Sequence, residues 1–375
     1  MDACLHRLYN EFQYGKKYLD QQNDYIIRRQ VLENESMFPA CLHKKSRYFS
    51  DNIKHKIINE GAYLLSSSCR MLGKDFNVNV IICNAIEYVN VEKIFFTIFL
   101  WLYVISVITT DNSSTCSRTL DITLFLVDVP KELPIMGSET IGPEHVNSGY
   151  TYTCKENNEI VIYREEEWLK VLIHESFHAY GLDFSAFNMD QYQERIRKLF
   201  NINVELLIYE SYCETWARLL NVMINHFIEQ PSIKFTTFKK KCITDFQKET
   251  VHSIVQACKI LKFMGLSYTI ITTSDKKLKA CSLTLYKENT NVFCYYIITA
   301  LLMFYADDLF KWCGDNNYDY LCIPKNTKNI IKFIEFIEKR YKTEEFVELM
   351  DDCLDMDELR DPTLRMSSFF VDMAK

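Results

Sequence analysis

The residues whose types and spacing could do chemistry in this chain lie between positions 174 and 214. His174, Glu175 and His178 form an H-E-x-x-H pattern. Residues four apart in a helix lie one turn above each other, so both imidazoles can face one metal ion, typically zinc. Zinc lowers the pKa of a bound water toward ~7, and Glu175 is placed to take its proton and pass it to a leaving amine. This pattern predicts metal-assisted hydrolysis.

The same pattern has a plainer interpretation. Two half-buried histidines on a structural helix could hydrogen-bond to neighbours and hold no metal. The chain has 8 histidines in all, and two of them fall on one face of a helix that directly follows the strand-like segment 159–163. That position behind a strand favours the metal-binding interpretation.

A catalytic zinc site needs a third protein ligand and an open fourth position. The metzincin form requires a histidine six residues after His178, but Phe184 stands there and Asp183 is one place away. The gluzincin form takes a glutamate from a later helix, and residues 209–221 (YESYCETWARLLN) supply Glu210 and Glu214. Either glutamate could be the ligand on spacing alone.

Here the sequence resembles the gluzincin metallopeptidases. Residues 209–217 (YESYCETWA) are similar to the helix of that clan in which a Glu binds zinc and an acid four residues later orients a ligand histidine. The resemblance implies Glu210 as the third ligand and Glu214 as the orienting acid. Position 214 departs from the clan's pattern because it holds Glu instead of Asp, so the two roles could be exchanged.

The resemblance also implies a substrate-binding strand and an oxyanion donor. Residues 146–151 (VNSGYT) would form an edge strand that pairs with an extended peptide; an ordinary surface hairpin is the alternative. The strand candidates are Asn147, Ser148, Gly149 and Tyr150. The candidates for stabilising the tetrahedral oxyanion are His226, Tyr295 and Tyr296, each of which could instead be a packed core residue.

A second resemblance covers about residues 120 to 305. The segments NSGYT, IVIYREEEWLKVLIHESFH with GLDFS, and YKENTNVFCYYIITALL are similar to H-E-x-x-H proteins encoded by large nucleocytoplasmic DNA viruses. This resemblance implies an intracellular viral protein, with the host cytoplasm or the virion as its location.

The elements that must position these residues indicate an α+β protein that is mostly helical. The first ninety residues show apolar side chains at helical spacing, which predicts helices there. Residues 120–129 and 159–163 are predicted to be strands. The chain beyond Val204 is predicted to be helical except for a strand at 267–273. Glu165–Glu167 would occupy the first turn of the H-E-x-x-H helix, and Gly181 would end it. We therefore expect a zincin-like fold with a small central sheet, an H-E-x-x-H helix and a helical C-terminal half.

Four regions follow from this reading. They are a helical N-terminal region (1–115), a zincin-like catalytic core (116–230), a helical C-terminal subdomain (231–343) and an acidic tail (344–375). Residues 94–110 carry no charge for 17 positions. They are predicted to form a buried core helix, since no cluster of Lys or Arg flanks them; a membrane anchor is the alternative.

Composition sets limits on partners and compartment. The net charge is −7, of which residues 344–361 contribute −8 from nine acids and one base. The rest of the chain is nearly neutral, so nucleic acid is not an expected partner, whereas the acidic tail could be a solvated helix face or bind a protein. The 14 cysteines show no C-x-x-C pair, and the N-terminus has no apolar signal-peptide run. We expect reduced thiols inside a cell and no secretion by a signal peptide.

Two hypotheses result. The first is a metallopeptidase that acts on a protein or peptide, with one Zn²⁺ per chain held by His174, His178 and Glu210, and with Glu175 as the general base. The second is a virion structural or interaction protein that keeps a zincin fold with little or no protease activity.

Overall fold

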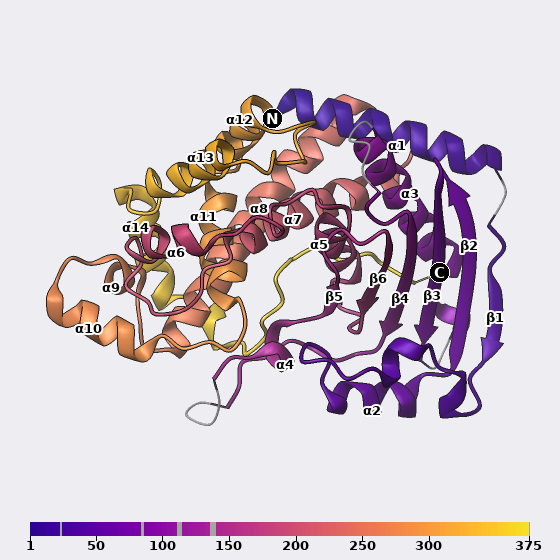
Figure 1. Ribbon diagram of the computed structural model, residues 1–375, viewed down its shortest axis with the longest axis horizontal. Coiled ribbons are helices and arrows are strands. Elements are labelled where there is room, and N and C mark those ends of the chain that lie inside the picture. Colours follow the sequence, from indigo (N-terminus) through magenta and orange to yellow (C-terminus); the bar gives the residue numbers. More distant parts are fainter. Residues whose placement is uncertain (23–24, 84–85, 111–114, 136–139, 375) are drawn as a thin grey trace.

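The computed structural model describes residues 1–22, 25–83, 86–110, 115–135 and 140–374 and combines one mixed sheet with a larger helical part (Figure 1). The strands are β1 (Arg28–Val31), β2 (Tyr63–Met71), β3 (Lys74–Ile82), β4 (Thr119–Leu126), β5 (Gly149–Thr151) and β6 (Asn157–Ile162). The first five helices are α1 (Asp2–Gln22), α2 (Asp51–Glu60), α3 (Val91–Thr110), α4 (Pro143–Val146) and α5 (Trp168–Tyr180), which follows β6. The later helices are α6 (Asp190–Arg197), α7 (Ile208–Glu229), α8 (Phe235–Phe263), α9 (Tyr268–Thr272), α10 (Lys276–Leu285), α11 (Thr299–Phe304), α12 (Ala306–Asn316), α13 (Thr327–Glu338) and α14 (Glu344–Asp352).

The sheet has the strand order β1-β2-β3-β4-β6-β5. The β3–β4 and β4–β6 pairs are parallel, and the other pairs are antiparallel. β4 and β6 are the strands that the sequence predicted at 120–129 and 159–163. β5 lies at the edge of the sheet, where its free side can accept another strand.

Apolar side chains alternate between the two faces of the sheet, as expected for strands buried on both sides. Phe76, Val78 and Val80 of β3 face the main core together with α1, α3, α5 and α7. Ile81 and Phe125 face the opposite side, where α2 and the segment before it form a smaller core (Figure 1). The central strands are therefore enclosed between helices, whereas the residues of β1 at the sheet edge are exposed.

α3 is the helix that the sequence predicted at 94–110. Among the described residues it is the one continuous helix long and apolar enough to cross a membrane, and 67% of its most apolar window is buried. Its Trp101 indole donates to Ser176 Oγ of α5 at 3.1 Å. This packing favours a core helix, and membrane attachment stays a prediction.

The expectation of a helical N-terminal region is wrong for three segments, because β1, β2 and β3 all lie within residues 1–115. These strands join β4, β5 and β6 in one sheet, so the sheet crosses the expected boundary at residue 115. The strand expected at 267–273 is also wrong. That segment is α9, whose first turn is capped by the Ser267 hydroxyl on the backbone N–H of Ile270.

The expected tail is part of the protein body. Leu364, Met366, Ser367 and Val371 are all buried, with Leu364 and Ser367 at 0% exposure. The backbone N–H of Leu364 donates to the carbonyl of Lys131 at 2.7 Å. Residues 362–374 thus pack against the core because their few apolar side chains outweigh the surrounding charge; binding of a partner to the acidic part stays a prediction.

The expectation of fourteen reduced thiols is wrong for one pair. Cys116 and Cys154 form a disulfide that joins the segment before β4 to the loop between β5 and β6. Twelve cysteines are free, and most of them are buried. The buried free thiols therefore act as small apolar side chains.

Candidate metal centre

The H-E-x-x-H segment lies on α5, which is buried between the sheet and α7. The helix begins at Trp168 rather than at Glu165, so the three glutamates precede it instead of forming its first turn. Glu167 is the N-terminal flanking residue, with a left-handed φ of 59°. Gly181 ends the helix with φ 62°, as predicted, because glycine adopts this conformation without strain. His174 and His178 face the same side of α5.

Glu210 completes a triad with these histidines. It lies in the first turn of α7, and its Oε2 is 3.2 Å from His174 Nε2 and 3.3 Å from His178 Nε2. The two Nε2 atoms are 3.3 Å apart. All three side chains are buried, and their donor atoms converge on one point that could hold a metal ion.

The spacing of the three donor atoms is that of a tetrahedral metal site. Ligands that each lie about 2.0–2.1 Å from a tetrahedral zinc are about 3.3 Å from one another. The triad provides two imidazoles and one carboxylate, a donor set found in catalytic zinc sites that keep a fourth position open. The residues therefore fit a metal ion of this kind without rearrangement.

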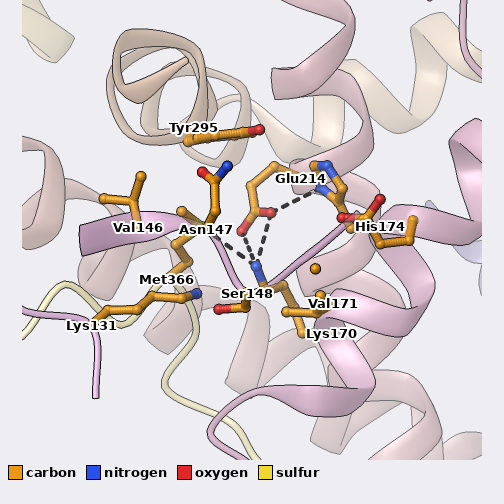
Figure 2. A pocket seen from close by; sticks show the side chains of 12 residues that line it. Lys131, Val146, Asn147, Ser148, Lys170, Val171, His174, Glu214, Tyr295 and Met366 are labelled. Carbon is orange, nitrogen blue, oxygen red and sulfur yellow. Dashed lines mark hydrogen bonds and ion pairs between the residues drawn. The ribbon is translucent and has the colours of Figure 1, made fainter. Parts of the chain in front are cut away.

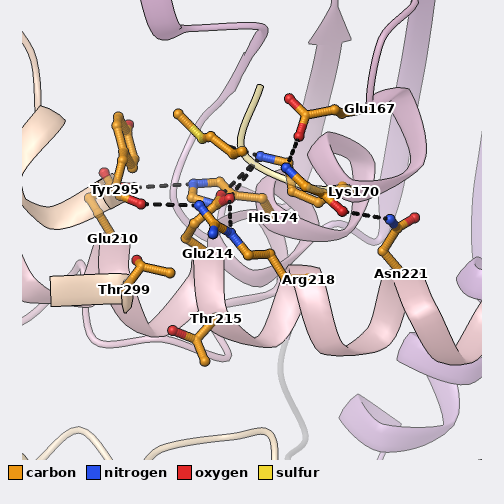
Figure 3. Close-up of polar contacts among 12 residues, drawn as sticks. Glu167, Lys170, His174, Glu210, Glu214, Thr215, Arg218, Asn221, Tyr295 and Thr299 are labelled. Atoms are coloured by element: carbon orange, nitrogen blue, oxygen red, sulfur yellow. Dashed lines mark hydrogen bonds and ion pairs between the residues drawn. The ribbon is translucent and has the colours of Figure 1, made fainter. Parts of the chain in front are cut away.

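Glu214 lies one helical turn after Glu210 and contacts the other side of His174. Its Oε2 is 3.1 Å from His174 Nδ1, and the carboxylate also accepts from Lys170 Nζ at 3.0 Å and from Arg218 Nε at 3.0 Å (Figure 3). The structure thus separates the two glutamates, with Glu210 in the triad and Glu214 behind it. An N–H at Nδ1 that donates to Glu214 leaves the Nε2 lone pair free for a metal.

Asp183 holds His178 in the same way. Its Oδ2 lies 2.5 Å from His178 Nδ1, and its Oδ1 accepts from Ser185 Oγ at 2.9 Å. In the sequence Asp183 stands out only as an acid one place before the metzincin ligand position, which does not predict this role. The available signal was an acid just beyond the Gly181 turn, five residues after His178.

The neighbouring charges at the site shift the pKa values of its imidazoles and carboxylates. Burial alone would lower the pKa of His174, but the carboxylates of Glu210 and Glu214 raise it overall. Burial also opposes ionisation of Glu210, yet His178 and His174 lower the pKa of its carboxyl to about 2. Glu214, despite burial, has a pKa held well below its usual range by Lys170, His174 and Arg218. A metal must therefore displace protons from the imidazoles, so its affinity increases with pH.

A cleft of about 190 Å³ opens beside the triad. Glu175, next to His174 on α5, lines it together with the triad and Tyr295. Burial raises the pKa of Glu175 above its usual value. A carboxylate with a raised pKa is better suited to exchanging a proton near neutral pH.

β5 forms one wall of this cleft. Gly149, Tyr150 and Thr151 line it together with the preceding Asn147, and within the described residues the strand that pairs with β5 is β6. A Cβ on Gly149 would lie 2.9 Å from the backbone oxygen of Val161 and 3.4 Å from Glu175 Cγ. The strand can therefore lie this close to α5 only because residue 149 is glycine. Ser148 lines a second, smaller pocket beside the cleft.

The three oxyanion candidates separate clearly. Tyr295 lines the cleft, and its ring centroid is 5.9 Å from that of His174. It belongs to a π-helical segment, Phe293–Ile298, a distortion often found at functional sites. Burial raises the pKa of Tyr295 well above its usual value, so its hydroxyl keeps its proton.

The other two candidates are engaged elsewhere. The Tyr296 hydroxyl donates to the carbonyl of Leu364 at 2.6 Å. His226 Nε2 lies 2.7 Å from Asp245 Oδ2, near the far end of α7. These contacts give both side chains structural roles.

Three buried cations beside the site were not predicted from the sequence. Lys131, Lys170 and Arg218 are each 2% exposed or less. Lys131 Nζ lies 2.6 Å from Glu167 Oε2. Lys131 and Lys170 pair with acids more than thirty residues away in the sequence, and Arg218 pairs with Glu214, one helical turn before it.

No protein-family model, curated protein or solved structure matches this chain. The geometry of the metal centre is therefore what indicates the chemistry of this protein.

Proposed function

We propose that the protein is a zinc-dependent metallopeptidase. The observation that carries this proposal is the triad of His174, His178 and Glu210, whose donor atoms are 3.2–3.3 Å apart beside the carboxylate of Glu175. A metal-free structural pair of histidines would not need a third donor at the same spacing. It would also not need separate carboxylates on the outer nitrogen of each ring.

The choice of zinc is supported by the donor set. Imidazole and carboxylate ligands in a three-donor arrangement suit Zn²⁺, and an open fourth position on the cleft side is typical of catalytic rather than structural sites. When bound, zinc acts as a Lewis acid and lowers the pKa of a water toward ~7.

The residues around the site suit hydrolysis of a peptide bond. Glu175 takes the proton of the attacking water and passes it to the leaving amine. The Tyr295 hydroxyl, protonated at neutral pH, is the donor available to the oxyanion that forms on the carbonyl oxygen. Asp183 and Glu214 fix the orientation of the two imidazoles.

A peptide substrate is supported by the edge strand. The free side of β5 faces the cleft, so an extended chain can pair with its backbone and pass Glu175 and the triad. The order of elements, with β5 antiparallel to β6 and α5 following β6 directly, agrees with the zincin-like, gluzincin-type fold that the sequence resembles. We extend the proposal to that fold and to the intracellular viral setting that the second resemblance implies.

Metal content and cleavage together test this function. Protein produced with zinc in excess should contain about one zinc per chain, His174→Ala should lose it, and Glu175→Gln should retain it. Cleavage of a random peptide mixture by the wild type should fall by about 10²-fold or more in Glu175→Gln. Metal-free wild-type protein would contradict the proposal. Equal cleavage by the two zinc-loaded proteins would instead favour a structural or interaction role.

A further inference from the structure

A second, smaller pocket adjoins the cleft at the metal centre. The two cavities share five lining residues, namely Asn147, Gly149, His174, Glu175 and Tyr295. Figure 2 shows the side chains around the small pocket, among them Asn147, His174 and Tyr295, which also line the cleft, and Lys131, Lys170 and Met366, which do not. A substrate group that enters it would therefore lie directly beside a metal ligand and the proposed general base.

Two buried ammonium groups line the pocket. Lys131 is 1% exposed and Lys170 is 2% exposed. Lys170 Nζ lies 3.0 Å from each oxygen of Glu214, and its third contact is the Met366 sulfur at 3.5 Å, a weak acceptor. Among the described residues, Lys131 Nζ donates to one oxygen acceptor, Oε2 of Glu167. Since an ammonium carries three N–H groups, Lys131 has two left to donate into the pocket, and Lys170 can exchange its weak contact with the sulfur for a ligand oxygen.

A hydroxyl without a partner lies on the same wall. Ser148 is 4% exposed, and its Oγ has no hydrogen-bond partner within the described part of the chain. A buried polar group without a partner costs free energy unless a ligand or water satisfies it. The hydroxyl thus adds one more unsatisfied group that a ligand oxygen would match.

Two carboxylates, those of Glu175 and Glu214, also line the pocket and would repel an anionic ligand unless they are neutralised. Glu214 is already balanced by Lys170 and Arg218, both 3.0 Å away. Glu175 faces both cavities and lies next to His174. Lys131 and the Ser148 hydroxyl are the donors with unused hydrogen-bonding capacity on this wall, and they favour an acceptor oxygen on the ligand.

The pocket is small, and Met366 forms part of its wall. Its volume of about 30 Å³ corresponds to about two water positions, which admits a short side chain and excludes an aromatic ring. Met366 forms part of the inner wall, and its segment is held by bonds from Leu364 N–H to the Lys131 carbonyl and from Ser367 N–H to Glu167. The inner wall is therefore a fixed limit on side-chain length.

We propose that this pocket binds a short acidic side chain, that of aspartate, on the residue adjacent to the cleaved peptide bond. The inference rests on the proposed function, because it assigns the substrate class of the same metal centre. Lys131, Lys170 and the Ser148 hydroxyl bind the carboxylate, and Met366 limits its length.

Binding of metal-chelating hydroxamates to the zinc-loaded wild type tests the inference without any need for turnover. Three compounds would be compared by calorimetry, differing only in the side chain next to the hydroxamate: carboxymethyl, carbamoylmethyl and isobutyl. The carboxymethyl compound should bind about tenfold more tightly than its neutral amide, which corresponds to about 1.4 kcal/mol. Equal affinities, or tightest binding of the isobutyl compound, would overturn the acidic preference.

This comparison also separates the two proposals. Zinc-dependent binding of all three compounds with no preference leaves the metallopeptidase proposal intact and removes the acidic pocket. Absence of binding by any of them to zinc-loaded protein removes both.

Variants identify the residues responsible. Ser148→Ala removes only the unpartnered hydroxyl and should reduce the preference for carboxymethyl over carbamoylmethyl about threefold. Lys131→Met combined with Glu167→Gln removes a buried pair together and should abolish the preference; if this variant fails to fold, Ser148→Ala and the wild-type comparison still decide. Met366→Ala should shift the preference toward a carboxyethyl side chain, and an unchanged preference for carboxymethyl would overturn the role of Met366.

Discussion

Glu214 Oε2 lies 3.1 Å from His174 Nδ1, while His174 Nε2 lies 3.2 Å from Glu210 Oε2. The imidazole is thus held between two glutamates that are one helical turn apart on α7. Lys170 and Arg218 fix the outer glutamate and leave the inner one for a metal. The spacing of four residues on α7 is therefore what gives two identical side chains different roles.

Glu214→Gln should weaken zinc binding about 10- to 100-fold, because the neutral amide orients the His174 ring less well. The dissociation constant would be measured by competition with a chromophoric chelator. Glu229→Gln is a matched control at the other end of α7, where the carboxylate is 57% exposed. An unchanged constant in Glu214→Gln would contradict the orienting role.

Asp183→Asn should have a similar effect through His178, whose Nδ1 lies 2.5 Å from the Asp183 carboxylate. We expect a loss of zinc affinity of about 10- to 100-fold, again by chelator competition. Asp190→Asn, at an exposed position in the first turn of α6, provides the control. If the control loses as much affinity, the effect is one of general charge and the interpretation fails.

Gly149→Ala should destabilise the protein by about 1–3 kcal/mol, because the new Cβ would lie 2.9 Å from Val161 O and 2.9 Å from Val171 Cγ1. Urea unfolding measures this change. At Gly142 the same substitution meets only the flexible end of Glu144, so Gly142→Ala should change stability by less than about 0.5 kcal/mol. Equal stability of the two variants would show that β5 can move away from α5.

Ser176→Ala should cost about 1–3 kcal/mol of unfolding free energy, since it leaves the buried Trp101 N–H without its acceptor. In a Trp101→Phe background the same substitution should cost much less, because the unsatisfied donor is gone. A full cost in both backgrounds, or none in either, would contradict the packing of α3 against α5.

His252 should make stability depend on pH. Burial lowers its pKa to about 4 from an ordinary 6.5. The unfolded chain therefore binds a proton between pH 6.5 and 4 that the folded chain does not, so stability decreases as pH falls through this window. The loss is roughly 3 kcal/mol in full. His252→Gln should lose less stability than the wild type between pH 7 and 4, and parallel pH profiles would exclude this effect.

The sequence predicted the parts of the structure that depend on local pattern. The H-E-x-x-H helix, its stop at Gly181, β4, β6 and the apolar helix α3 all follow from periodicity and capping. The convergence of Glu210 with the two histidines agrees with the spacing argument. The helices and strands are encoded within a few residues of each position, whereas the meeting of Glu210 with His178, 32 residues earlier, depends on the fold.

The remaining features depend on contacts distant in the chain. β2 contains the polar run Ser66–Ser68 and becomes a strand because β3 pairs with it, which no local propensity indicates. Nothing in the sequence around Lys131 indicates that it is buried, because its partner Glu167 is 36 residues away and is brought to it by the fold. The many acids before Leu364 and Met366 likewise predicted a solvated tail, although these apolar side chains are buried.

The position of residues 362–374 has a consequence for biosynthesis. Met366 lines the small pocket of a site whose candidate ligands lie on α5 and α7, about 160 to 190 residues earlier in the chain. A ribosome-bound chain that has already exposed His174, His178 and Glu210 still lacks this wall and the partner that Ser367 provides for Glu167. The three metal-binding side chains can meet before residues 362–374 have packed, but the small pocket is complete only after they have, so formation of the proposed substrate site is a late step in the folding of the chain.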